Sequence, residues 1–175
     1  MIVHCFDFDG TLVYTPGREQ AERDYLAATG KPWPHIGFYG RPESLIPPVF
    51  PDVPEESHAV ADVIKVCREG TPDLRILMTG RPYKMRQRVL DICGHLGLQF
   101  DETYFRGQRD CNNSGDTFDF KKGVLQKLLI LNVKELEMWE DREDHYIAFS
   151  TLFDEFRVIR PEVNFVLNRV LPLVG

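Results

Sequence analysis

The chain has 175 residues and a formal net charge of −6 at pH 7, with 43% hydrophobic and 27% charged residues. This composition is typical of a globular protein, and the length predicts a single domain over residues 1–175. The negative charge argues against a broad basic surface of the kind that binds duplex nucleic acid nonspecifically. No apolar run approaches the roughly 20 residues of a membrane span, so we expect no membrane partner.

The cysteines and the start of the chain predict a reducing, intracellular location, the cytoplasm or the nucleus. An apolar strand is expected from residue 2, which leaves no room for a cleaved targeting segment. The four cysteines form no C-x-x-C pair, and three of them fall in apolar positions. This pattern favours buried free thiols and argues against zinc. The four are Cys5, Cys67, Cys93 and Cys111.

The first expected strand, residues 2–6, is followed by the segment Asp7-Phe8-Asp9-Gly10-Thr11. Residues at positions i and i+2 of a strand point the same way. Asp7 and Asp9 are therefore expected to face one substrate or one cation, just before a sharp turn at glycine.

Residues 13–54 form an irregular insert that holds eight of the twelve prolines and at most one helix, at about residues 18–29. Its aromatic cluster has two interpretations. The rings stack on a nucleobase, or they form a small satellite core under a proline-rich segment, which is the more common arrangement. The cluster consists of Trp33, Phe38 and Tyr39, interleaved with His35 and Arg41.

From residue 55 onward, helical and strand patterns alternate. Helices are expected around residues 60–67, 82–96, 124–129 and 145–156, and strands around 74–78, 101–106, 136–139 and 163–167. Pro82 suits the first position of its helix, and residues 107–116 form a polar loop. Strands separated by amphipathic helices predict an α/β fold, a mainly parallel sheet covered on both faces.

Polar residues follow three of the expected strands, where ligands bind in open parallel sheets. They are Asp7 and Asp9, then Thr79-Gly80-Arg81, then Glu140-Asp141. The carboxylates of Asp7, Asp9 and Asp141 would repel one another without a cation, and all-oxygen ligation suits Mg²⁺. The alternative for residues 140–144 is an acidic helix N-terminus.

Basic residues are expected at helix starts, where the helix dipole disfavours cations. Arg81 and Lys84 open one helix, and Lys121 and Lys122 open another. A bound anion would explain this placement, although solvated side chains explain Lys84 and Lys122 equally well. His145 shares the apolar stripe of its helix, which predicts a packed, hydrogen-bonded histidine rather than a catalytic one.

The motifs F-D-F-D-G-T-L, M-T-G-R, a helix-opening lysine and an acidic strand end resemble those of the haloacid dehalogenase (HAD) superfamily of phosphohydrolases. The sequence looks most like the phosphatase domain of polynucleotide kinase-phosphatases and the Swiss Army Knife RNA repair-like branch. Thr79-Gly80-Arg81, Glu140-Asp141-Arg142 and the stretches 37–45 and 117–121 carry that likeness. The resemblance implies a three-layer Rossmann-like fold, and the chain leaves no room for a large cap domain.

The resemblance also implies a two-step phosphoryl transfer. Asp7 would be the nucleophile that forms an aspartyl-phosphate, and Asp9 would act as acid and then base. Lys121 would offset the charge of nucleophile and phosphate, although spacing does not separate it from Lys122. Asp141 would complete a Mg²⁺ site with Asp7 and the backbone carbonyl of Asp9.

The direct metal ligand stays open within that assignment. Glu140 stands where many relatives carry aspartate, so it is an alternative direct metal ligand to Asp141. The residues expected to bind the phosphate are Thr11, Thr79, Gly80 and Arg81.

An open site favours a large substrate, so we expect removal of a terminal 3′ phosphate from an RNA or DNA end. The domain is expected to be fused to, or associated with, nucleic acid repair enzymes. One alternative is a small-molecule phosphatase or nucleotidase. Another is a catalytically silent phosphate-binding module, which would predict loss of Asp7 or Asp9, and both are present.

Overall fold

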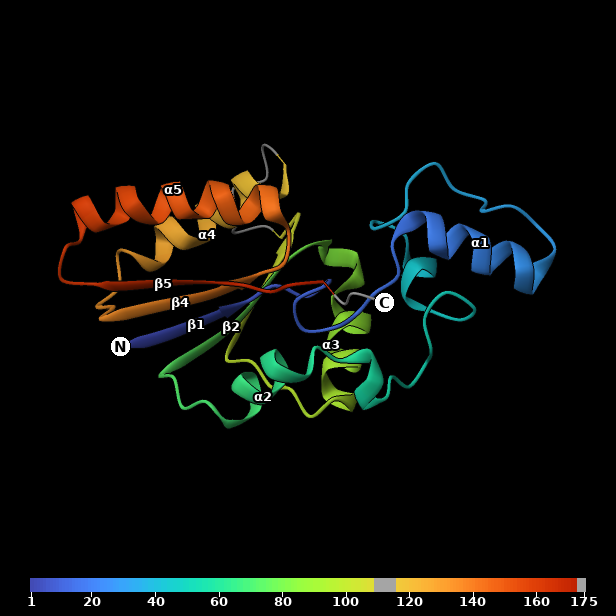
Figure 1. Cartoon of the computed structure of the whole chain (residues 1–175), viewed down its shortest axis with the longest axis horizontal. Helices are drawn as coiled ribbons and strands as arrows, with labels where there is room; N and C mark the ends of the chain where they lie inside the picture. The colour runs from blue at the N-terminus through green and yellow to red at the C-terminus, as the bar shows by residue number, and fades with distance from the viewer. Residues whose placement is uncertain (109–115, 173–175) are drawn as a thin grey trace.

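The chain folds into three layers, with a parallel sheet between two pairs of helices (Figure 1). The computed structural model describes residues 1–108 and 116–172. The strands are β1 (Ile2–Phe6), β2 (Leu74–Pro82), β3 (Glu102–Arg106), β4 (Glu135–Glu140) and β5 (Asn164–Arg169). The α-helices are α1 (Arg18–Thr29), α2 (Ala61–Glu69), α3 (Arg86–His95), α4 (Thr117–Leu128) and α5 (Glu143–Ile159). Short 3₁₀ turns are η1 (Pro42–Leu45), η2 (Glu56–His58) and η3 (Tyr83–Met85).

The sheet has the order β3-β2-β1-β4-β5, and every neighbouring pair is parallel. Alternate residues of β1 enter opposite cores. Val3 and Cys5 pack with α4 and α5, whereas Phe6 packs with α2 and α3. The predicted α/β, Rossmann-like fold is therefore confirmed. No described helix is both long and apolar enough to cross a membrane.

The insert after β1 carries α1 and η1 and extends to one end of the sheet (Figure 1). Two of its clustered aromatic residues, Trp33 and Phe38, join a separate small core, as the second interpretation predicts, in which Ala21, Phe38 and Val49 are buried against Tyr25 and Trp33. Tyr39 lies outside this core and is half exposed. Through Phe38, this core anchors residues 37–45 beside the ends of β1 and β2.

Cys5, Cys67 and Cys93 are free and buried, as predicted. Cys111 lies outside the described residues, as does most of the predicted loop 107–116. The thiol pKa of Cys5 rises to about 12 because of burial, so this group stays protonated.

Two predicted helix starts are wrong. The apolar pattern stops at Met78, but β2 continues to Pro82, which pairs with Arg106 of β3. Pro82 therefore precedes η3 in extended conformation, and Arg81 lies in a strand rather than at a helix N-terminus. The next helix, α4, begins at Thr117, so Lys121 lies just beyond its first turn.

Candidate active site

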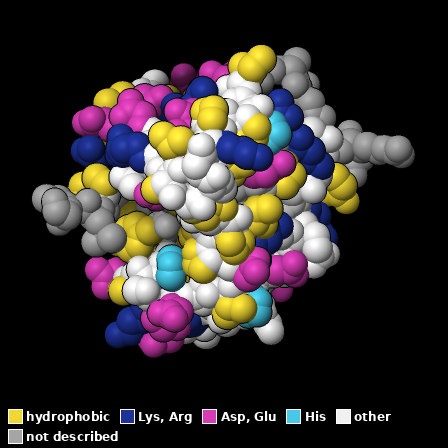
Figure 2. Space-filling model, turned by 90° about the vertical axis from the view of Figure 1, so that its right-hand side faces the viewer, with side chains coloured by type: hydrophobic (Ala, Val, Ile, Leu, Met, Phe, Trp, Pro, Cys, Tyr) yellow, Lys and Arg dark blue, Asp and Glu magenta, His cyan; other side chains and the backbone are white. Residues whose placement is uncertain are grey.

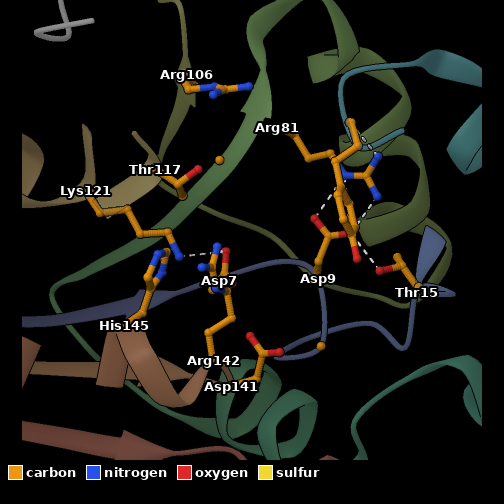
Figure 3. Close-up of a pocket in the computed structure, with 14 residues that line it drawn as sticks. Asp7, Asp9, Thr15, Arg81, Arg106, Thr117, Lys121, Asp141, Arg142 and His145 are labelled. Carbon is orange, nitrogen blue, oxygen red and sulfur yellow. Dashed lines mark hydrogen bonds and ion pairs between the residues drawn. The ribbon is translucent and has the colours of Figure 1, made fainter. Parts of the chain in front are cut away.

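Three strand ends meet at a reversal of the strand order. Strand β1 lies between β2 and β4, and the crossovers on its two sides run in opposite directions. Ligands bind at such switch points. A pocket of about 610 Å³ opens there (Figure 3). It is lined by Asp7, Asp9, Gly10, Thr15, Gly17, Tyr39, Gly80, Arg81, Arg106, Thr117, Lys121, Asp141, Arg142 and His145.

Two glycines let separate strand ends approach each other. Gly10 has φ 72°, and a Cβ there would collide with the carboxylate of Asp141. A Cβ on Gly80 would lie 2.7 Å from the hydroxyl oxygen of Thr117. Both positions therefore need glycine if the loop after β1 is to meet β4 and β2 is to meet α4.

Lys121 links the nucleophile candidate to β4. Its Nζ lies 3.0 Å from Asp7 Oδ1 and 2.8 Å from Glu140 Oε2, and its side chain is 1% exposed. Burial opposes the charge of Lys121, but Asp7 and Glu140 outweigh it and raise the pKa. Burial also opposes the charge of Glu140, yet Lys121 and His145 lower its pKa to about 2. Of the two neighbouring lysines, Lys121 lines the pocket and contacts Asp7, whereas Lys122 is not among the described lining residues.

The acidic residues around Lys121 carry more negative charge than one ammonium can balance. Burial, followed by Glu140, raises the pKa of Asp141 to about 6. Burial raises the pKa of Asp7 well above its usual range, and Glu140, Asp141 and Asp9 add to the shift. A cation bound at this position would lower the pKa values of both Asp7 and Asp141.

The same residues are close enough to share that cation. Ligand oxygens of Asp7, Glu140 and Asp141 all lie within 4.8 Å of one another. The oxygens of Glu140 are engaged, one by Lys121 and the other by the backbone N–H of Arg142. Asp141 Oδ1 accepts a hydrogen bond of 3.2 Å from the Thr11 hydroxyl. The donor set fits Mg²⁺ and favours Asp141 over Glu140 as the direct ligand.

The Asp9 side chain lies apart from this acidic cluster and binds Arg81 (Figure 3). Nη2 of Arg81 donates to Asp9 Oδ1 at 2.6 Å and Nε donates to Oδ2 at 2.9 Å, while the hydroxyl of Thr15 donates to Oδ1 at 2.7 Å. The remaining nitrogen, Nη1, donates to the carbonyl of Tyr39 and the hydroxyl of Ser44. All three nitrogens of Arg81 are thus engaged within the protein, and its predicted phosphate contact stays a prediction.

The remaining predicted phosphate ligands lie at different depths. Gly80 lines the pocket. Thr11 and Thr79 are fully buried, and the hydroxyl of Thr79 accepts a hydrogen bond of 3.1 Å from the N–H of Arg81. Their roles in phosphate binding stay predictions.

Two arginines besides Arg81 line the pocket, and one of them, Arg106, has no local signal in the sequence. Arg106 ends the weakest strand pattern, and its guanidinium points into the pocket (Figure 3). Arg142 is held by Asp144, with 2.6 Å between Nη2 and Oδ2. Within residues 1–108 and 116–172, the guanidinium of Arg106 makes no hydrogen bond or ion pair.

His145 is packed, as predicted. It is 5% exposed and touches the rings of Phe118 and Phe149. Its Nδ1 is 3.7 Å from Glu140 Oε2 and makes no hydrogen bond within the described part of the chain. It forms part of the pocket wall.

Comparison with known proteins identifies the family. Residues 57–171 match the family described as HAD domain family 1 in Swiss Army Knife RNA repair proteins. The chain belongs to this family. The match spans β2 to β5 but begins after Asp7 and Asp9, so the roles of these two residues depend on the site geometry. Searches of curated proteins and of solved structures find no match.

Proposed function

We propose that this HAD domain is a Mg²⁺-dependent phosphomonoester hydrolase in which Asp7 is the nucleophile. The observation that carries the proposal is the placement of Asp7. Its carboxylate lines the pocket, is 6% exposed, and lies 3.0 Å from the buried ammonium of Lys121. A carboxylate held by a fixed cation in a site of low dielectric is suited to covalent catalysis at phosphorus.

The reaction would proceed in two steps. An oxygen of Asp7 attacks phosphorus, the bond from phosphorus to the ester oxygen breaks, and Asp9 gives that oxygen its proton. Asp9 then takes a proton from water, the water oxygen attacks phosphorus, and the bond to Asp7 breaks to release phosphate. Among the described residues, Asp9 Oδ2 accepts from Nε of Arg81 alone, whereas Oδ1 accepts from Arg81 and Thr15. Oδ2 is therefore the oxygen that can carry the proton.

The metal would be held by Asp7, Asp141 and the backbone carbonyl of Asp9. Bound Mg²⁺ would supply charge compensation for the nucleophile and the phosphoryl oxygens. Thr11 would orient Asp141 through its hydrogen bond of 3.2 Å, and Lys121 would hold Asp7.

The substrate we propose is a nucleic acid end with a terminal 3′ phosphate. Arg106 and Arg142 line both the main pocket and an adjoining pocket of about 340 Å³. Two arginines shared by neighbouring pockets suit a chain of phosphates. On the face shown in Figure 2, described Lys and Arg side chains alternate with acidic ones rather than forming one basic patch. Such a surface favours recognition of an end over binding along a duplex.

A substrate panel tests this proposal. Phosphate release with Mg²⁺ is measured on 3′- and 5′-phosphorylated RNA and DNA oligonucleotides, mononucleotides, sugar phosphates and phosphopeptides, with Asp7→Asn as the control. We expect the highest kcat/KM on 3′-phosphorylated oligonucleotides. Equal or better turnover of mononucleotides or sugar phosphates would replace the nucleic acid substrate with a small one. No release from any substrate would refute the phosphatase itself.

A further inference from the structure

One aromatic side chain stands at the edge of the pocket. Tyr39 comes from the insert, outside the residues that match the family, and it is 50% exposed. Among the described residues that line this pocket, it is the one phenylalanine, tyrosine or tryptophan. The other lining groups are charged, polar or glycine, so Tyr39 is the one large apolar surface that a substrate meets there.

The ring is held in place before any substrate binds. The carbonyl of Tyr39 accepts a hydrogen bond of 2.8 Å from Nη1 of Arg81. The guanidinium of Arg81 lies 5.2 Å from the ring centroid, where it covers one face. The edge contact with Phe38 is 5.0 Å between centroids, and Phe38 is buried in the small core of the insert. Stacking on a ring fixed in this way costs little conformational entropy.

Arg81 connects this ring to the chemistry. The same guanidinium that lies against Tyr39 binds Asp9 through Nε and Nη2. The ring is therefore positioned relative to the acid that protonates the leaving oxygen. In a nucleotide, the sugar and base attached to that oxygen would extend toward the aromatic surface.

We propose that Tyr39 is the stacking platform for the base of the terminal nucleotide, which makes it a specificity-determining residue. This inference rests on the proposed function, because it assigns a subsite to the same substrate. Loss of a base-stacking ring typically costs about 5- to 150-fold in binding. We expect a loss of that size in kcat/KM for Tyr39→Ala.

The test compares two 3′-phosphorylated oligonucleotides that differ only at the terminal nucleotide, which carries a base in one and is abasic in the other. The wild type should prefer the first, and Tyr39→Ala should remove that preference while Tyr39→Phe restores it. Tyr83→Ala is the matched control, because Tyr83 is 49% exposed and does not line the pocket. An unchanged preference in Tyr39→Ala would overturn the inference.

A binding measurement separates the inference from the proposed function. In an Asp7→Asn background, fluorescence anisotropy reports the affinity for both oligonucleotides without turnover. Equal affinities with and without the base would overturn the role of Tyr39 whatever the activity. A base-dependent affinity that Tyr39→Ala removes supports the inference, even if the wild type proves to have no phosphatase activity and the proposed function fails.

Discussion

Replacing Lys121 by methionine should destabilise the fold, because it leaves two buried carboxylates facing one another. Lys121 contacts both Asp7 and Glu140, and the side chain of Glu140 is 0% exposed. Removing one partner of a buried ion pair costs about 3–5 kcal/mol. In a domain of this size each kcal/mol lowers Tm by about 2–4 °C, so we expect a decrease of about 6–20 °C.

Thermal unfolding in the presence of a chelator measures this cost. Lys122→Met is the matched control, since Lys122 is the next residue, is only half-buried and makes no described ion pair; its change should stay within about 0.5 kcal/mol. Adding Glu140→Gln to Lys121→Met should recover stability. Equal losses for the two lysine variants would refute the reasoning.

The stability lost in Lys121→Met should depend on pH. The pKa of Glu140 is lowered to about 2 from its usual 4.5, so its contribution is present above pH 4.5 and is lost as pH falls toward 2. The difference in stability between wild type and Lys121→Met should therefore shrink over that window.

Four further predictions concern catalysis and metal binding. Asp9→Asn should slow alkyl phosphates more than aryl phosphates, whose leaving group needs no proton, and equal losses in kcat/KM would contradict its acid role. Arg81→Lys should also lower kcat/KM more for alkyl than for aryl phosphates, but by a smaller factor, because lysine holds the Asp9 carboxylate less firmly. A loss confined to oligonucleotides would instead indicate that Arg81 contacts a phosphate. Activity should need Mg²⁺ or Mn²⁺ and be blocked by Ca²⁺. Since Asp141 has a pKa near 6 without metal, the Mg²⁺-induced rise in Tm should be larger at about pH 7.5 than at about pH 5, and Asp141→Asn should remove most of it.

The parts of the site that follow from local pattern were predictable. An apolar run followed by Asp7 and Asp9, and a second run followed by Glu140-Asp141, correctly predict two neighbouring strand ends. The parallel pairing of β1 with β4 then brings these ends together. The match to residues 57–171 confirms the HAD resemblance that these motifs carry.

The parts that depend on contacts distant in sequence were not predictable. The side chain of Arg81 is drawn toward Asp9, 72 positions away, and β2 extends past its apolar residues to pair with β3. Arg106 is one arginine at the end of a weak strand pattern, so only the fold shows that it points into the pocket. Tyr39 was noted as a stacking candidate, but its contact with Arg81 needed the structure.

Trapping the covalent intermediate tests the central claim most directly. The enzyme is mixed with an oligonucleotide whose 3′ phosphate is radiolabelled, quenched in acid within its first turnover, and digested for peptide mapping. We predict labelled phosphate on the peptide that contains Asp7 in the wild type and none in Asp7→Asn. Rapid turnover with no label on that peptide at any time would contradict the assignment of Asp7 as nucleophile.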